Sequence, residues 1–92
     1  VEWMLARVLA MQGQPEGLEL AQSTIDRMRE RLEDSDWRLR IKYAALKLPP
    51  FKPVPHPDDL DHSRALLEEL SGRYGEDAPR LRELSAALTG MP

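Results

Sequence analysis

Cysteine is absent from this chain of 92 residues. Disulfide bonds, thiolate metal sites and cysteine nucleophiles are therefore excluded. A domain of this length lies near the lower limit for independent folding, so it has to be stabilised by well-packed helices or by a neighbouring protein surface. Hydrophobic residues make up 41% and charged residues 32% of the sequence, and this composition is too apolar for a disordered chain.

A basic excess and a long apolar run are missing as well. The formal net charge of −3 argues against a dedicated nucleic-acid-binding domain, which carries more basic than acidic residues. No apolar run approaches the roughly 20 residues needed to span a membrane, and residues 1–11 lack a basic leader, so a cytoplasmic location is expected. Glycine-rich phosphate loops, nucleophile elbows and spaced carboxylate pairs are also absent, so we predict neither catalysis nor a bound cofactor.

The spacing of apolar residues predicts an all-α fold of about five helices, arranged as antiparallel hairpins or a bundle. Glycine and proline residues mark several of the expected helix ends. The predicted helices cover 1–12, 15–33, 36–48, 58–72 and 77–90, with Asp58 or Asp59 capping the fourth, Asp77 capping the fifth and Gly90 ending it.

The first predicted helix is apolar around nearly its whole circumference. Only Glu2, Arg7 and Gln12 are polar in it, so we expect the helix to be buried on several sides. It also begins without an N-cap residue, which indicates a chain cut from a larger protein. Its apolar face is therefore expected to contact a protein partner, a domain of the parent chain or a second copy of this chain.

The second and third helices carry clear apolar faces. The core residues of the second are expected to be Leu18, Ala21, Ile25, Met28 and Leu32, whose 3-4 spacing is typical of a helix on an antiparallel neighbour. Residues 34–36 form a turn that supplies the N-cap of the third helix. That helix has two opposite apolar faces, one of Leu39, Tyr43 and Leu46 and the other of Trp37, Ile41, Ala44 and Leu48. We therefore expect it to lie between two layers.

Four cations lie on the third helix between these apolar faces, and no acid accompanies them there. They are Arg38, Arg40, Lys42 and Lys47. They are the candidate contacts to nucleic acid or to an acidic partner, because Lys and Arg supply most contacts to phosphate. The competing interpretation pairs them with Asp26, Glu30 or Glu33 of the second helix.

Five of the eight prolines fall within 49–57. Alternating prolines favour an extended polyproline stretch, so this segment is expected to link a three-helix unit at 1–48 to a two-helix hairpin at 58–92. In the hairpin the inward-facing residues are predicted to be Leu60, Leu67, Leu70, Leu81, Leu84 and Leu88. The two units are expected to form one compact domain or a fragment of a larger protein.

Two short motifs near the proline segment have a functional and a structural interpretation. The run from His56 to His62 contains imidazole and carboxylate groups, which are ligands for zinc or iron. Its spacing matches no helical ligand pair, and acids in a first helical turn are explained by the helix dipole. Pro50 to Pro53 matches the PxxP pattern of a ligand for aromatic grooves, whereas a stiff spacer is the commoner role of such a segment.

Two family resemblances can be named from particular residues. The stretch from Leu5 to Leu18 resembles the centre of a tetratricopeptide-type repeat, where one helix ends at a glycine, here Gly13, and a second begins shortly afterwards. Residues 1–48 also resemble the helical subdomain of bacterial replicative DNA primases. The second resemblance rests on residues 1–5 with Arg7, on Pro15-Glu16-Gly17 before a long amphipathic helix, and on Leu39 with Tyr43.

Both resemblances imply a helical accessory module. The catalytic acids and zinc ligands of the primase family lie outside the similar segment, so no functional residue is carried over from it. The sequence therefore predicts a non-catalytic α-helical protein-interaction or scaffolding module. The alternative is an accessory subdomain of a DNA-replication enzyme that acts near nucleic acid.

Overall fold

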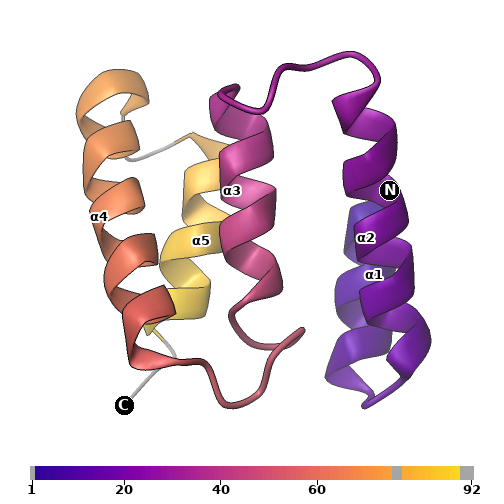
Figure 1. The fold of residues 1–92 in the computed structure, drawn as a ribbon. Helices are drawn as coiled ribbons and strands as arrows, with labels where there is room; N and C mark the ends of the chain where they lie inside the picture. The colour runs from indigo at the N-terminus through magenta and orange to yellow at the C-terminus, as the bar shows by residue number, and fades with distance from the viewer. Residues whose placement is uncertain (1, 76–77, 90–92) are drawn as a thin grey trace.

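Five α-helices make up most of the chain, which is known here from a computed structural model that describes residues 2–75 and 78–89 (Figure 1). Across those residues no strand is present, so the predicted all-α class and the five helices are confirmed. The radius of gyration is 12.6 Å, as expected for a compact chain of this length. The helices are α1 (Glu2–Met11), α2 (Pro15–Arg29), α3 (Trp37–Leu46), α4 (Pro57–Tyr74) and α5 (Pro79–Thr89).

The first two helices form a tight antiparallel hairpin. Gly13 adopts a left-handed φ of 76°, and the Gln14 N–H donates to the Leu9 carbonyl over 2.9 Å, which ends α1 as the sequence predicts. Gly17 brings the helices together, because a Cβ at this position would lie 2.5 Å from the Ala10 nitrogen. The spacing of apolar residues does not predict this close approach.

The second helix is shorter than predicted. It ends at Arg29 and not near Glu33, and the chain turns where the N–H of Leu32 donates to the Met28 carbonyl over 2.8 Å. Of the predicted core residues, Ala21 and Ile25 are buried and Met28 packs partly, whereas Leu18 is exposed. Met28 is the last residue of α2 that packs against the core, and the chain then crosses to α3.

The third helix lies between two hydrophobic cores, as its two apolar faces predicted (Figure 1). Leu39 belongs to a core shared with α1, α2 and Phe51, while Ile41 and Ala44 belong to a core shared with α4 and α5. The Asp36 carboxylate caps the helix by accepting from the Arg38 N–H at 3.0 Å. Tyr43 is exposed, so its assignment to a buried face was wrong.

The proline segment is not simply extended over the surface. Residues 47–54 form turns and bends, and the Lys52 N–H donates to the Leu48 carbonyl over 3.0 Å. Phe51 is buried, and its ring centroid lies 5.2 Å from that of Trp3. The prediction of an extended linker is therefore wrong at its first half, because one aromatic side chain offers enough apolar surface to fold the segment back onto the core.

The last two helices pack against α3 through their leucines. Leu70, Leu81, Leu84 and Leu88 are buried as predicted, and Leu60 and Leu67 pack partly. The fourth helix is capped by His56, whose Nδ1 accepts from the Asp58 N–H at 3.1 Å, and not by Asp58 or Asp59. The helix continues to Tyr74, two residues beyond the predicted end. The predicted cap Asp77 and terminator Gly90 lie outside the described residues.

Both hydrophobic cores contain residues of α3. The expected units at 1–48 and 58–92 therefore share this helix. Ile41, Ala44 and Leu48 pack with the helices on the far side of the proline segment. The chain therefore joins its two predicted units through a shared central helix. The division itself stays a prediction, since packing within one chain does not test whether either unit folds separately.

Candidate functional site

Each of the four α3 cations has a carboxylate partner. Arg40 pairs with Glu69 of α4, and Lys42 pairs with Glu83 of α5. The N···O distances are 2.9 Å for Arg38–Asp36, 2.8 Å for Arg40–Glu69, 3.5 Å for Lys42–Glu83 and 3.8 Å for Lys47–Asp59. The expected partners Asp26, Glu30 and Glu33 were wrong, because the N-cap Asp36 and acids of α4 and α5 lie closer to the cations.

Two of these pairs are hydrogen-bonded strongly enough to shift the pKa of both partners. The side-chain hydrogen bond from Arg40 lowers the pKa of the Glu69 carboxyl, and the same bond raises the pKa of Arg40. The bonds between Arg38 and Asp36 act in the same directions on their pKa values. These cations are therefore already neutralised by neighbours within the chain.

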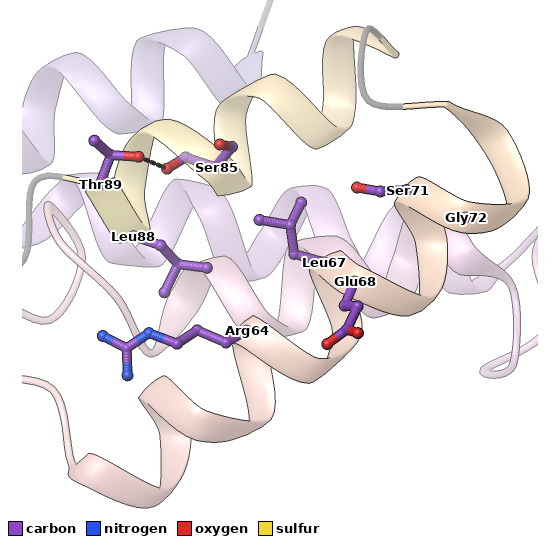
Figure 2. A pocket seen from close by; sticks show the side chains of 8 residues that line it. All are labelled: Arg64, Leu67, Glu68, Ser71, Gly72, Ser85, Leu88 and Thr89. Atoms are coloured by element: carbon purple, nitrogen blue, oxygen red, sulfur yellow. Dashed lines mark hydrogen bonds between the residues drawn. The ribbon is translucent and has the colours of Figure 1, made fainter.

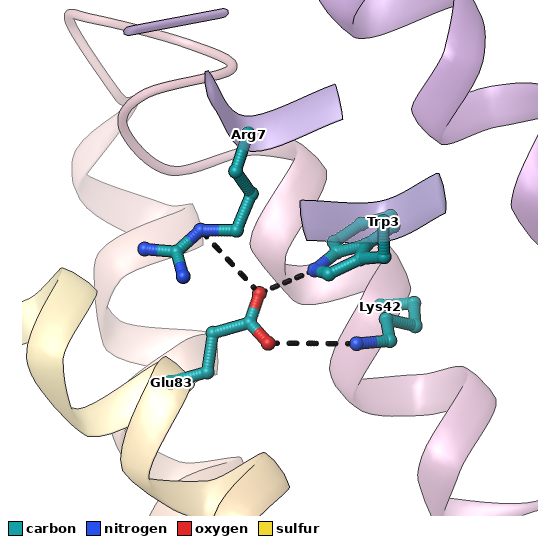
Figure 3. Close-up of polar contacts among 4 residues, drawn as sticks. All are labelled: Trp3, Arg7, Lys42 and Glu83. Atoms are coloured by element: carbon teal, nitrogen blue, oxygen red, sulfur yellow. Dashed lines mark hydrogen bonds and ion pairs between the residues drawn. The ribbon is translucent and has the colours of Figure 1, made fainter. Parts of the chain in front are cut away.

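Lys42 belongs to a polar cluster at the junction of α1, α3 and α5, defined by Trp3, Arg7, Lys42 and Glu83 (Figure 3). The Trp3 indole N–H donates to Glu83 Oε1, and Arg7 Nε lies 3.7 Å from the same oxygen. Lys42 Nζ approaches the second oxygen and lies 4.4 Å from the centroid of the Trp3 ring. One carboxylate thus holds three donors from two other helices.

Burial has a clear electrostatic effect on this cluster. Only 8% of Lys42 is exposed, so loss of hydration lowers the pKa of its ammonium group, while Glu83 opposes that change. Arg80 and Arg7 lower the pKa of Lys42 further by charge repulsion. Lys42 is consequently a structural cation and is not presented to a polymer on the surface, as a nucleic-acid contact requires.

The clearest exposed apolar surface lies on α1. Met4, Leu5, Val8 and Met11 are 67%, 51%, 47% and 71% exposed, whereas Trp3 and Ala6 on the opposite side are buried. We call these four exposed residues the α1 face. Within the single chain α1 is thus buried on one side only, and its exposed apolar side agrees with the expected interface on this helix.

A shallow groove separates α4 from α5 and has a volume of about 550 Å³ (Figure 2). Its charged residues are Arg64 and Glu68, and Arg64 lies 3.6 Å from Asp61 on its own helix. The Thr89 hydroxyl donates to the Ser85 carbonyl over 2.8 Å and is therefore already used. The groove offers no converging set of polar groups that would orient a ligand.

The two short motifs have local structural roles in the described residues. No group of three or more His, Asp or Glu side chains there lies close enough to hold a metal ion, and His56 is the helix cap already described. In the PxxP match the aromatic side chain of Phe51 is buried against Trp3. No helix within the described ranges is long and apolar enough to cross a membrane.

Comparison of the chain with protein-family models, with curated proteins and with solved structures finds no match. The resemblances to tetratricopeptide repeats and to the primase helical subdomain therefore stay predictions. The function of this chain is therefore inferred from its own surface.

Proposed function

We propose that this chain is a non-catalytic α-helical interaction module that pairs with a second copy of itself through the α1 face. The observation that carries the proposal is the exposure of four large apolar side chains on one side of α1. Their combined exposed surface is on the order of 400 Å², the size of the largest apolar patch on many monomers, which is often an interaction site. Such a patch suffices for the apolar centre of a modest protein interface.

The spacing of the α1 face suits an antiparallel pair of helices. Met4, Val8 and Met11 follow a 4-3 spacing, which forms a continuous apolar seam along a helix. In an antiparallel pair centred near Val8, Met4 of one copy lies opposite Met11 of the other, and the two Val8 side chains meet. A two-fold symmetric contact requires this kind of self-complementary pattern.

The charges near the α1 face also favour a second copy. Arg7 turns inward to Glu83, and Glu2 pairs with Arg27 of α2. The face itself contains no charged residue, so self-association places no like charges opposite each other. The alternative accessory role near nucleic acid has less support, because the α3 cations already have carboxylate partners.

Sedimentation velocity over a series from low micromolar to millimolar protein tests the proposal. The wild type is expected to shift from monomer to dimer, and the double substitution Leu5→Glu, Val8→Glu is expected to stay monomeric. Val54→Glu is the matched control, because Val54 is 84% exposed and lies outside the α1 face. A wild-type chain that remains monomeric at millimolar concentration would overturn the pairing.

A further inference from the structure

A second surface with a distinct character lies where α2, α3 and α5 meet. Here the structure has a pocket of about 540 Å³, within the usual range for small-molecule sites. We call it the basic pocket, because four of its lining residues are cations and none is acidic. Its cations are Arg31, Arg38, Lys42 and Arg80, and its apolar wall contains Met28 and Leu32.

Two of the four cations are not neutralised by the described part of the chain. No carboxylate in residues 2–75 or 78–89 forms an ion pair with Arg31 or Arg80. The guanidinium carbon of Arg80 lies 5.9 Å from the centroid of the Trp37 ring, which holds the side chain near the pocket. Within the described residues these two cations thus lack an ion-pair partner, and they come from different segments, Arg31 after α2 and Arg80 in α5.

The other two cations, Arg38 and Lys42, differ in what they offer a ligand. Arg38 uses Nε and Nη2 to hold Asp36, so its Nη1 is left to donate elsewhere. Lys42 is buried and already held by Glu83 and the Trp3 ring, so it adds positive charge and no donor. A ligand with several anionic oxygens is therefore met by Arg38 Nη1 and by the guanidinium groups of Arg31 and Arg80.

The charge of Arg80 also affects the pKa of two nearby groups. Burial is the main cause of the lowered pKa of Lys42, and Arg80 contributes to it by repulsion. The pKa of Asp36 is lowered first by its hydrogen bond from Arg38, and Arg80 adds to that effect. Arg80 thus acts on two groups at the pocket, although the whole chain has a formal net charge of −3.

We propose that the basic pocket binds a phosphate monoester whose ester group is apolar. A phosphate monoester has three terminal oxygens and nearly two negative charges, which suits guanidinium groups that approach from different helices. Met28 and Leu32 form a wall against which an apolar ester group can be buried. A polynucleotide is disfavoured, because two cations outside the pocket, Arg40 in α3 and Lys47 directly after it, are held by Glu69 and Asp59.

Nuclear magnetic resonance titration at constant ionic strength tests this site with two probes, inorganic phosphate and phenyl phosphate. We expect saturable shifts at the amides of Met28, Arg31 and Arg80, with phenyl phosphate binding several-fold more tightly. The double substitution Arg31→Gln, Arg80→Gln is expected to weaken binding about tenfold, because it removes strong charge-assisted hydrogen bonds to the phosphate. Circular dichroism checks that this variant keeps its helices.

The matched control is Arg64→Gln, Arg73→Gln, which removes the same charge from exposed positions of α4, outside the basic pocket. This control is expected to leave the affinity unchanged. Shifts that do not saturate, or an equal loss of affinity in the control, would overturn the site. Equal affinity for the two probes would overturn the apolar ester, and a single-stranded oligonucleotide that binds far more tightly than phenyl phosphate would overturn the choice of a small ligand.

Discussion

Trp3 and Glu83 are hydrogen-bonded partners separated by 80 positions in the sequence, the indole N–H of α1 donating to the carboxylate of α5 (Figure 3). The same carboxylate receives Arg7 and Lys42. This single side chain therefore connects the N-terminal hairpin to the last helix of the described chain. Its removal tests how much of the fold depends on that connection.

We expect Glu83→Ala to lower the free energy of unfolding by roughly 2 kcal/mol, because it leaves a mostly buried ammonium group without its counter-charge. Urea denaturation followed by circular dichroism measures the change. The comparison variant is Glu69→Ala, which breaks the exposed pair with Arg40 and should cost far less. Equal losses in the two variants would show that Glu83 has no special role.

Lys42 is expected to make stability depend on pH in the alkaline range. Its pKa in the folded chain is below the ordinary value of 10.5, mainly because of burial, so between these two pKa values the unfolded chain binds more protons. Stability therefore rises with pH across that window and levels off above 10.5. The measurement is the difference in unfolding free energy between the wild type and Lys42→Met from pH 8 upward. A difference that falls or stays constant contradicts the expected sign.

The close contact of α1 and α2 predicts opposite effects for two glycine substitutions. Gly17→Ala places a Cβ against backbone atoms of α1, 2.5 Å from Ala10 N and 2.7 Å from Ala6 O, so the hairpin must open. We expect a loss of roughly 2 kcal/mol in spite of the better helix propensity of alanine. Gly72→Ala meets no atom within 4 Å and should stabilise α4 by about 0.5–1 kcal/mol. Thermal unfolding of both variants measures these two changes in the free energy of unfolding.

The helices and the two-sided packing of α3 were predictable from the sequence because they depend on local periodicity. Leu39 and Ile41 lie on opposite faces of any regular helix, whatever surrounds it. Gly13 likewise ends α1 by its own left-handed conformation. These features need no knowledge of distant contacts.

The candidate sites were less predictable, because they depend on residues brought together from distant segments. Nothing in the sequence near Lys42 indicates Glu83 as its partner, and the basic pocket combines Arg31 with Arg80 only through the packing of α2 and α5 on α3. The apolar face of α1 was expected to need a partner, but which of its residues stay exposed in the single chain was not predictable, for a related reason. An apolar helix indicates that burial is needed but does not show which part of the chain provides it.

The burial of Phe51 gives a further test of the proline segment. Phe51→Ala should lower the free energy of unfolding by roughly 3 kcal/mol, since it empties a site packed against Trp3. Val54→Ala, at an exposed position of the same segment, should change it by less than about 0.5 kcal/mol. Hydrogen exchange should also show slow exchange at the Lys52 amide, which is bonded to the Leu48 carbonyl. Fast exchange of the Lys52 amide would contradict the folded-back segment and support the extended linker.

The α3 cations provide the test between the interaction module and the nucleic-acid alternative. Because Arg40 and Lys47 are held by Glu69 and Asp59, the substitutions Arg40→Gln and Lys47→Gln together should not change the affinity for a short DNA duplex at low salt. Removing the acids instead, with Glu69→Gln and Asp59→Asn, should free both cations together with Lys52, which also pairs with Asp59, and create salt-sensitive binding.

Fluorescence anisotropy over a range of salt concentrations measures both pairs of variants. Each newly freed cation that contacts a phosphate should add about one to the slope of log affinity against log salt. Micromolar binding by the wild type that disappears in Arg40→Gln, Lys47→Gln would mean that DNA displaces the carboxylate partners. That result would favour the accessory role near nucleic acid over the interaction module, since ion pairs within the chain would then be a resting state of a DNA-binding surface.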